Sequence, residues 1–434
     1  MLTVAYLANR FPAAVEPYVM EEIEELRSRG IRVIAGSARR PRTEDECLTM
    51  RCAPEVVLQP LQALVLLRAL WLCVRSWRRL SPLVGRILFR GSEGPLERAK
   101  ALLHTWLGAC YAVRLQTLGV DHIHVHHGFF GSWVAMVAAR LLDVGFSMTL
   151  HGSDLLLRGR YLDVKLARCA FCLTVSEFNR QYILQHYPEV DSSNVMTMRL
   201  GVEVVESVMP VRRPQAHNPR LNLLAVGRLH AVKDHAFLVR ACADLATRGV
   251  PFECLIAGEG PERRHLEALI RKFELSERVF LLGHIPREQM ASLYDRADLV
   301  VLTSRSEGIP LVLMEAMASG KIVLAPEITG IPELIIGGKT GFLYKAGSMG
   351  HFQGRLLLIR SLMFQEASLD QAQLSSNSSS VVRQLDWVRH AARVHVRHNF
   401  NRKKNLELFG ELFLRRVAPR IERIPHESLV LQQI

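Results

Sequence analysis

Short apolar runs alternate along the chain with longer segments in which apolar residues recur every three or four positions. Residues 2–8 form the first apolar run, residues 16–29 follow a helical pattern that ends at Gly30, and residues 31–35 form the next run. A buried parallel strand, a helix and a second strand at this spacing make a βαβ unit. The pattern therefore predicts a doubly wound α/β domain that begins with the first residues.

The same alternation occurs in both halves of the chain. Between the halves, residues 206–220 contain three prolines and little apolar periodicity, so this stretch is predicted to be a linker. A chain of 434 residues is too long for one ordinary core, so two domains are expected. The prediction is an N-terminal Rossmann-like domain over 1–205, a second one over 221–390, and terminal helices over 391–434.

A strand, a tight loop and a helix are also predicted across residues 298–320. Pro310 suits the first helical turn and Gly320 suits the helix end. The loop would present unpaired backbone N–H groups at the helix start, where the helix dipole adds about half a positive charge. Such a start attracts phosphate, and the carboxylates of Glu307 and Glu315 suit hydroxyl groups. A sugar nucleotide offers both kinds of group.

Charged residues and histidines follow other predicted strands. Arg228 and Lys233 follow the run that opens the second domain, and His151 follows a run that ends at Leu150. Asp154 is expected to cap the helix that comes next. Ligands of doubly wound sheets bind beyond the carboxyl ends of the strands, which puts Asn9, Arg10, Phe11, Pro12 and Glu16 at the ligand site after the first strand. The alternatives are a surface Arg–Lys pair, a structural histidine, and a Glu16 that only favours the helix dipole.

Histidines alternate along residues 120–128. His122, His124 and His126 share one face of a predicted strand, and His127 follows at its end. They lack a nearby carboxylate or cysteine partner to complete a zinc site, so no metal ion is expected.

The formal net charge of +13 predicts an acidic partner, which is nucleic acid, an anionic membrane surface or a phosphorylated substrate. No nucleic-acid-binding motif is recognised, so nucleic acid is not expected as a partner. The eight cysteines are scattered and are interpreted as free thiols. The first residues lack the basic leader and apolar core of a signal peptide, so a cytoplasmic protein is expected.

Residues 60–114 contain nine basic residues against two glutamates, a net charge of +7. The apolar run over 61–74 contains one arginine and is shorter than the roughly 18–20 residues that span a bilayer. Five arginines recur at intervals of seven and four, as on one side of a helix that Pro82 must break or bend; they are Arg68, Arg75, Arg79, Arg86 and Arg90. This basic amphipathic surface suits peripheral contact with an anionic membrane, and a solvated helical face is the alternative.

The segment around the two glutamates resembles a known family. Glu307-Gly-Ile-Pro, Gly330-Ile-Pro-Glu-Leu and Lys339-Thr-Gly-Phe342 are similar to motifs of the retaining glycosyltransferases of family 4. The resemblance extends from the first residue to about residue 345 and resumes near the C-terminus. It implies the GT-B fold, in which two doubly wound Rossmann-like α/β domains face each other across a cleft and a terminal helix crosses back to the first.

Two segments depart from the usual family pattern. The loop after the first strand lacks the family's glycine pair, and residues 10–19 look like the subgroup that acts in exopolysaccharide and colanic-acid assembly. Gly201-Val-Glu203 stands where the family usually has Gly-Val-Asp, which is a mild departure.

The resemblance implies a role for each matching residue. Arg228 and Lys233 would grip the donor pyrophosphate, Glu307 would contact the donor sugar and Glu315 the ribose. His151 would lie at the reaction centre, in a catalytic set with Glu307, Arg228 and Lys233. The remaining assignments are donor-binding Gly308, Ile309, Pro310 and Leu311, and acceptor-side Arg10, Glu16 and His126.

The implied activity is retaining transfer of a hexose from a UDP- or GDP-sugar to a saccharide or polyprenyl-linked acceptor in polysaccharide biosynthesis. No cofactor and no metal ion is expected, and the protein would be cytoplasmic, with peripheral contact at the inner face of the cell membrane. A same-face displacement assisted by the leaving phosphate is the mechanistic hypothesis. The alternatives are a silent sugar-nucleotide-binding regulator, a nucleotide-sugar epimerase and a nucleic-acid-binding protein.

Overall fold

The computed structural model describes residues 1–13, 16–40, 52–59, 61–157, 159–204, 220–373 and 384–421, of which 367–373 and 419–421 are described by backbone alone. The chain forms two compact units. The N-terminal unit comprises Met1–Met198 and Lys404–Ile434, and the C-terminal unit comprises Arg199–Lys403. The first domain was predicted to end at residue 205, but Val202 pairs with Asn401 inside the C-terminal unit. The predicted linker lies outside the described residues except for Arg220.

The N-terminal unit has one parallel sheet of seven strands in the order β3-β2-β1-β4-β5-β6-β7. This order confirms the predicted doubly wound topology, with Ala5 of β1 in register with Ile34 on one side and Ile123 on the other. The strands are β1 (Thr3–Arg10), β2 (Arg32–Arg39), β3 (Val56–Val57), β4 (His122–His126), β5 (Gly145–Leu150), β6 (Phe171–Thr174) and β7 (Val195–Thr197).

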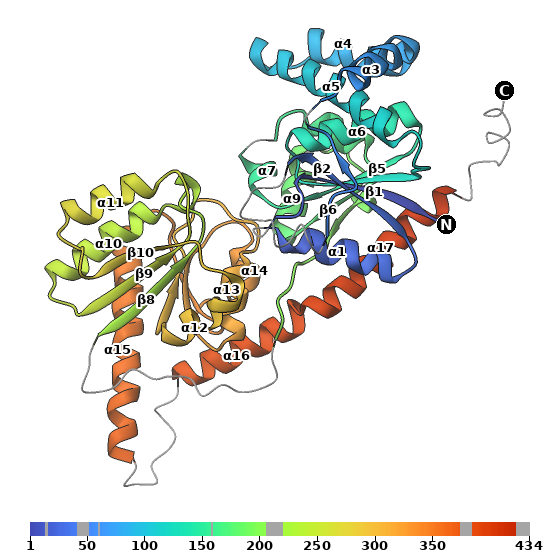
Figure 1. The fold of residues 1–434 in the computed structure, drawn as a ribbon. Helices are drawn as coiled ribbons and strands as arrows, with labels where there is room; N and C mark the ends of the chain where they lie inside the picture. The colour runs from blue at the N-terminus through green and yellow to red at the C-terminus, as the bar shows by residue number, and fades with distance from the viewer. Residues whose placement is uncertain are drawn as a thin grey trace. The chain divides into compact units, whose positions relative to one another are not determined.

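Helices cover both faces of this sheet (Figure 1). Side chains of β1 alternate between the two cores, because successive residues of a strand point to opposite faces. Val4 and Tyr6 pack with α1 (Pro17–Ser28) and α17 (Arg402–Ile421). Ala5 and Leu7 pack in the core that contains α5 (Pro95–Leu115) and α6 (Phe130–Leu142). The remaining elements are α3 (Ala63–Arg75), α4 (Trp77–Phe89), α7 (Ser153–Leu156), α8 (Leu162–Arg168), α9 (Glu177–His186) and the 3-10 helix Ser192–Asn194.

The helix α17 completes the core of the N-terminal unit although it comes last in the chain. Its Phe413 is fully buried, with ring centroids 5.6 Å from Phe171 of β6 and 5.3 Å from His124 of β4. The terminal helix therefore belongs to the first domain, as the resemblance implied.

The C-terminal unit repeats the doubly wound plan with a parallel sheet in the order β10-β9-β8-β11-β12-β13. Its strands are β8 (Leu221–Val226), β9 (Phe252–Ala257), β10 (Val279–Gly283), β11 (Leu299–Val301), β12 (Ile322–Pro326) and β13 (Phe342–Tyr344). One face packs against α10 (His235–Thr247), α11 (Arg263–Lys272) and α15 (Met349–Gln373). The other packs against α12 (Arg287–Arg296), α13 (Leu311–Ala318) and α14 (Ile331–Leu334), with α16 (Gln384–Asn399) on α13. A 3-10 helix spans Ala231–Lys233.

The arginine-rich segment differs from its prediction in two ways. The helix was expected to break or bend at Pro82, but α4 continues through Pro82 and the break lies at Ser76, between α3 and α4. Pro82 is exposed, so water can satisfy the carbonyl group that loses its hydrogen bond. Within the described residues, no helix has the length and apolar character to cross a membrane.

Candidate active site

The strand order of each unit places a ligand site where connections leave the sheet in opposite directions. In such sheets this switch point lies at the carboxyl ends of the two central strands. In the C-terminal unit these strands are β8 and β11, and the predicted donor-binding residues follow them. In the N-terminal unit they are β1 and β4, and Arg10, Glu16 and His126 lie at or just beyond their ends.

The two loops of the C-terminal unit are tied together by an ion pair. Lys233 Nζ lies 2.6 Å from Glu307 Oε1, and both side chains are largely buried. Arg305 donates its backbone N–H to Val232 O at 2.8 Å, and Thr303 Oγ1 donates to Lys233 O at 3.0 Å. The loop after β8 and the loop after β11 therefore form one surface.

The start of α13 leaves backbone donors free. Pro310 is the N-cap residue, and no side chain caps the helix. Pro310 itself has no N–H to offer. The N–H groups of Gly308, Ile309 and Leu311 make no hydrogen bond to any residue that the structure describes. Gly320 follows the helix with a φ of +69°, as expected of a helix end.

Three further side chains of this unit bear on the site. Tyr294 of α12 donates a hydrogen bond of 2.8 Å to Glu315 Oε2. Burial raises the pKa of Glu315 above its ordinary value. Arg228 is exposed, and its guanidinium has no hydrogen bond to a described residue. Lys233, Glu307 and the free amides at the start of α13 therefore lie on the one surface formed by the loops after β8 and β11.

A glycine turn supports the loop after β8. A Cβ atom on Gly258, whose φ is +147°, would lie 2.0 Å from Gly227 O, and one on Gly260 would lie 2.3 Å from Leu229 O. Gly227 N–H also donates to Ala257 O at 2.9 Å. Only glycine permits this close approach of two backbones.

We predict that Gly258→Ala destabilises the protein by about 2 kcal/mol or more, because the methyl group must displace the loop and the left-handed backbone is strained. Urea unfolding measures the change. Gly350→Ala is the matched control, since a Cβ at Gly350 meets nothing within 4 Å. Equal unfolding midpoints for Gly258→Ala and the wild type would contradict the packing described above.

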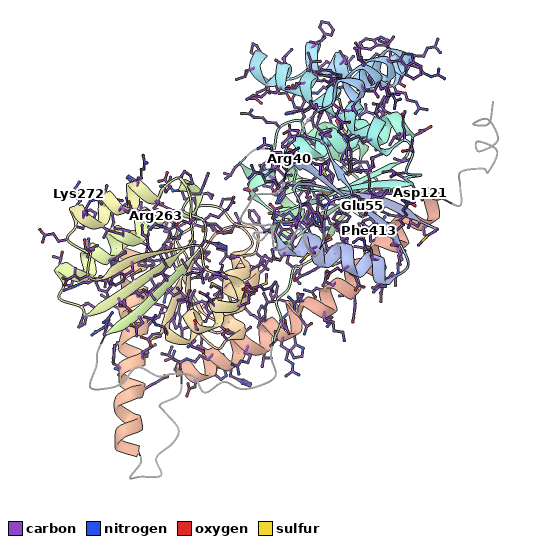
Figure 2. All side chains as sticks on the ribbon, in the orientation of Figure 1. Arg40, Glu55, Asp121, Arg263, Lys272 and Phe413 are labelled. Atoms are coloured by element: carbon purple, nitrogen blue, oxygen red, sulfur yellow. The ribbon has the colours of Figure 1, made fainter. Side chains whose placement is uncertain are left out.

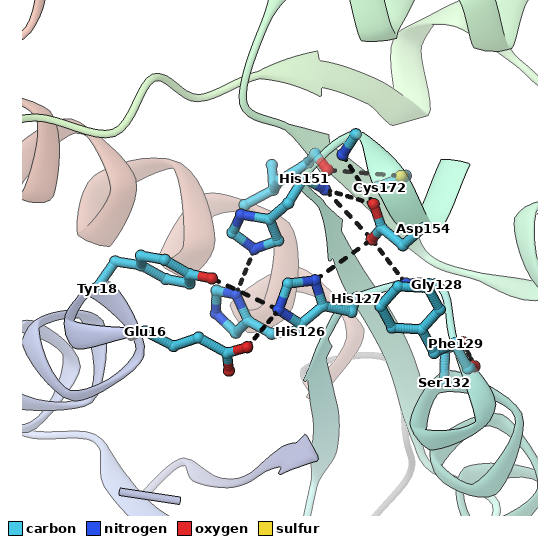
Figure 3. Close-up of polar contacts among 12 residues, drawn as sticks. Glu16, Tyr18, His126, His127, Gly128, Phe129, Ser132, His151, Asp154 and Cys172 are labelled. Carbon is cyan, nitrogen blue, oxygen red and sulfur yellow. Dashed lines mark hydrogen bonds and ion pairs between the residues drawn. The ribbon is translucent and has the colours of Figure 1, made fainter. Parts of the chain in front are cut away.

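In the N-terminal unit, Asp154 joins the loops that follow β4 and β5 (Figure 3). Its carboxylate accepts backbone N–H groups from Gly128 at 2.8 Å, His151 at 3.0 Å and Gly152 at 2.8 Å. Asp154 is completely buried, and burial opposes its ionisation, but His127 and these N–H groups outweigh burial and lower its pKa. The prediction that Asp154 caps the following helix misses this role, because it reaches back to the preceding loops.

His127 lies between two carboxylates. Its Nε2 is 3.1 Å from Glu16 Oε1, and its Nδ1 is 3.7 Å from Asp154 Oδ2. Burial disfavours protonation, but Asp154 and Glu16 outweigh it and raise the pKa of His127 to about 10. His127 is therefore a cation at neutral pH, and its backbone has the left-handed φ of +69°.

His151 is the neutral neighbour of this cation. Burial and the nearby His127 and His126 lower its pKa well below the ordinary value. The rings of His151 and Tyr18 stack at 4.6 Å, and His151 Nε2 lies 2.9 Å from His126 Nδ1. His126 Nε2 in turn lies 2.9 Å from Glu22 Oε2, which also accepts from Tyr6.

This hydrogen-bond chain assigns the ring protons. His126 donates from Nε2 to the Glu22 carboxylate, so its Nδ1 accepts from His151 Nε2–H, which leaves a lone pair on His151 Nδ1. The side chain of His126 has no exposed surface, so we expect it to orient His151 from behind.

The expectation that the histidines have no nearby carboxylate was wrong. Glu22 comes from α1, and its oxygen lies within 4.8 Å of nitrogen atoms of His124 and His126. Both nitrogens of His124 already contact hydroxyl groups, those of Ser147 at 2.7 Å and Thr149 at 3.1 Å. Hydrogen bonds within the protein therefore account for this cluster.

Several of these residues were not singled out from the sequence as site residues. His127, Tyr18 and Glu22 meet through tertiary structure, and the only sequence signal for His127 was its place beside Gly128 at the strand end. Lys165 was also not singled out from the sequence. It is buried and donates a hydrogen bond to Gly128 O, and burial lowers its pKa to about 7.

Two family models match consecutive parts of the chain. Residues 15–206 match the model described as glycosyltransferase family 4, and residues 212–366 match the model described as glycosyl transferases group 1. These matches contain the histidine cluster and the Lys233–Glu307 ion pair, respectively.

Curated proteins show the same similarity over shorter stretches. The putative colanic acid biosynthesis glycosyltransferase WcaL of Escherichia coli (strain K12) is 32% identical over 216 residues, which are 48% of this chain and 48% of that protein. The amylovoran biosynthesis glycosyltransferase AmsK of Erwinia amylovora is 30% identical over 254 residues, which are 56% of this chain and 61% of that protein. The chain thus spans about half of the length of these relatives.

A solved structure matches nearly the whole fold. Anabaena Alr3699/HepE, in complex with UDP and glucose, aligns with a TM-score of 0.63 at 16% identity over 95% of this chain and 99% of that chain. At this identity the match concerns the fold alone, which is GT-B. The chain therefore has the GT-B fold, with a glycosyltransferase family 4 domain followed by a glycosyl transferases group 1 domain.

Proposed function

We propose that the protein transfers a sugar from a nucleotide-sugar donor to a saccharide acceptor with retention of the anomeric configuration. The observation that supports this most directly is the uncapped start of α13 beside the Lys233–Glu307 ion pair. Free amides and cations bind a diphosphate, and an adjacent carboxylate binds sugar hydroxyl groups. The Anabaena structure holds UDP and glucose, which supports a nucleoside diphosphate sugar as the donor class.

Each residue of the C-terminal unit then has a definite task. Arg228 and Lys233 neutralise the diphosphate, which gains negative charge as the bond to the anomeric carbon breaks. Glu307 accepts hydrogen bonds from hydroxyl groups of the sugar. Tyr294 holds one side of Glu315, whose carboxyl group is left to bind the ribose.

We assign the acceptor to the N-terminal unit. The lone pair on His151 Nδ1 can accept the hydrogen bond of an acceptor hydroxyl, and the cationic His127 fixes the position of Glu16. In the reaction, the acceptor oxygen bonds to the anomeric carbon on the face that the diphosphate leaves, and the acceptor proton passes to the leaving phosphate oxygen. No metal ion or cofactor takes part in this scheme. The relatives are named for colanic acid and amylovoran synthesis, which supports a polysaccharide intermediate, free or lipid-linked, as acceptor.

Nucleotide release tests this proposal. The purified protein is offered UDP-, GDP- and ADP-sugars with membrane lipid extract, with and without EDTA, and the anomeric configuration of the product is read by NMR. One donor should turn over only with extract, equally in EDTA, and give a product with retained configuration. Arg228→Met should raise the KM for that donor about tenfold or more. The exposed Arg264, in the same unit, provides the control Arg264→Met.

Other outcomes identify other activities. Binding of one nucleotide without release from any donor would indicate a silent regulator. Conversion of the donor sugar without acceptor would indicate an epimerase. An inverted product or a trapped glycosyl-enzyme adduct would contradict the same-face mechanism, and absence of nucleotide binding would contradict the site itself.

A further inference from the structure

Helix α3 is apolar on two sides, and only one of them is packed. Val65, Ala69 and Leu72 are buried against the core of the N-terminal unit. A second set of apolar residues, which we call the α3 ridge, is exposed to between 56% and 70% of each side chain's full surface: Leu64, Leu67, Leu70, Trp71 and Val74. At 3.6 residues per turn the ridge covers an arc of about 120°.

Exposed apolar residues are concentrated in this part of the molecule. Among the described residues, ten of the nineteen exposed large hydrophobic residues lie between Leu64 and Leu103. They include Trp77 at the start of α4, which is 54% exposed, and Phe89 at its end, which is 83% exposed. Such a gathering marks an interaction surface, whereas single exposed apolar residues need no explanation.

The charge next to the ridge has one sign. The segment from α3 to the end of α4 contains no aspartate or glutamate. Arg68 and Arg75 flank one edge of the ridge, since they lie about 20–40° beyond Leu64 on the helical wheel. The guanidinium of Arg75 also lies 5.2 Å from the ring centre of Trp71.

The structure separates the arginines into two groups, and the single stripe predicted from the sequence was wrong. Arg79 bonds to carbonyl groups at the end of α6 and to Asp143, and Arg86 pairs with Glu93 and Asp163. Arg68, Arg75 and Arg78 are exposed and form no ion pair with any described residue. Arg68 and Arg75 beside the ridge, and Arg78 at the start of α4, are therefore available to a partner.

We propose that the α3 ridge and its three arginines dock the protein on an anionic lipid bilayer. A helix that lies in the interface buries apolar and tryptophan side chains among acyl chains and places arginines at the phosphate level. A protein partner would be expected to meet hydrogen-bonding side chains, and apart from the arginines and the indole N–H of Trp71 the exposed face of α3 has none. Figure 1 shows α3 and α4 at the outer edge of the helices that cover this face of the sheet, and Figure 2 shows their side chains projecting outward.

Vesicle flotation tests the docking without donor or acceptor, so it is independent of the proposed transferase activity. The full chain is mixed with vesicles of phosphatidylcholine, or of equal parts of phosphatidylcholine and phosphatidylglycerol. The protein should float with the mixed vesicles, and high salt should release it. Arg68→Gln/Arg75→Gln/Arg78→Gln should weaken partitioning by roughly 100-fold, from about fivefold for each arginine. Leu67→Ser/Trp71→Ser should weaken it by about tenfold or more.

The C-terminal unit provides matched controls. Trp387 of α16 is 54% exposed, so Trp387→Ser removes a comparable tryptophan, and Arg264→Gln/Arg271→Gln removes exposed charge. These variants should float like the wild type. Flotation of Leu67→Ser/Trp71→Ser at the wild-type level, or no flotation of the wild type, would overturn the proposal. A concentration-dependent dimer abolished by Leu67→Ser/Trp71→Ser, without flotation, would assign the ridge to a second copy of the chain instead.

Discussion

Replacing Lys233 by methionine is expected to lower kcat for donor cleavage by roughly 100- to 1,000-fold, the range found when one charge-stabilising donor is removed from an active site. The side chain of Lys233 is only 19% exposed and lies 2.6 Å from Glu307, so water cannot replace it at full strength. The effect should appear mainly in kcat, because the leaving group gains its charge as the bond breaks.

The same substitution is also expected to lower folding stability, and a double variant can separate this effect from the loss of activity. Without Lys233, the largely buried carboxylate of Glu307 loses its partner, which costs about 1–3 kcal/mol of folding stability. The double variant Lys233→Met/Glu307→Gln removes the orphan charge, so stability should recover while activity does not. Lys272→Met, at an exposed lysine of the same unit, should match the wild type in both measurements. A Lys233→Met enzyme within a few-fold of wild-type kcat would contradict the role of Lys233.

His127 is expected to contribute stability that is lost as the pH rises from about 6.5 to about 10. The folded pKa of His127, about 10, lies above its ordinary value of 6.5. Above the lower value the unfolded chain releases the proton that the native state retains, so alkaline pH favours unfolding. The stabilisation is fully present below pH 6.5 and amounts to a few kcal/mol, on the order of 1.4 kcal/mol per pKa unit.

The converse holds at acid pH for the partner of His127. The pKa of Asp154 is lowered, so its stabilisation is present above its ordinary value of 3.8 and is lost as the pH falls below it. Both shifts describe one interaction and are not additive. Stability should therefore be greatest between about pH 4 and 6.5 as far as this pair is concerned.

NMR titration of the histidine rings and urea unfolding as a function of pH test the role of His127. His127 should stay protonated to about pH 10, and the loss of stability caused by His127→Gln should shrink as the pH rises from about 6.5 to about 10. The exposed His265 of the C-terminal unit provides the control His265→Gln, whose free energy of unfolding should differ from that of the wild type by the same amount at every pH in this range. A His127 ring that titrates near pH 6.5 would show that Glu16 and Asp154 do not hold it as described.

The helices and strands that follow from the local pattern of apolar residues could be predicted from the sequence. The apolar run at residues 2–8 is β1. The helix that was expected to have Pro310 in its first turn begins one residue later, at Leu311, and ends before Gly320. Their positions along the chain, combined with the rule that ligands bind at strand ends, were enough to place Lys233 and Glu307 on one surface.

What depends on contacts between distant segments could not be predicted in this way. Glu22 lies 104 positions from His126 along the chain, and the two meet only because α1 packs over β1 and β4. The spacing of the arginines suggested one side of a helix that Pro82 breaks or bends, but Arg79 and Arg86 find acceptors on α6, Glu93 and Asp163. Sequence periodicity predicts which face of its helix a side chain lies on. It does not predict which residue of another element that side chain contacts.

The return of α17 to the N-terminal unit has a consequence for biosynthesis. The ribosome makes the strands of that unit first, yet Phe409, Phe413 and Val417 of its core come only after the whole C-terminal unit. At the usual rate of about 5–20 residues per second, translation of the intervening 199–403 takes on the order of 10 to 40 seconds. During this time the sheet face around Phe171 lacks its cover. The nascent N-terminal unit is therefore a natural client for chaperones, and the unit synthesised first is the last to be completed.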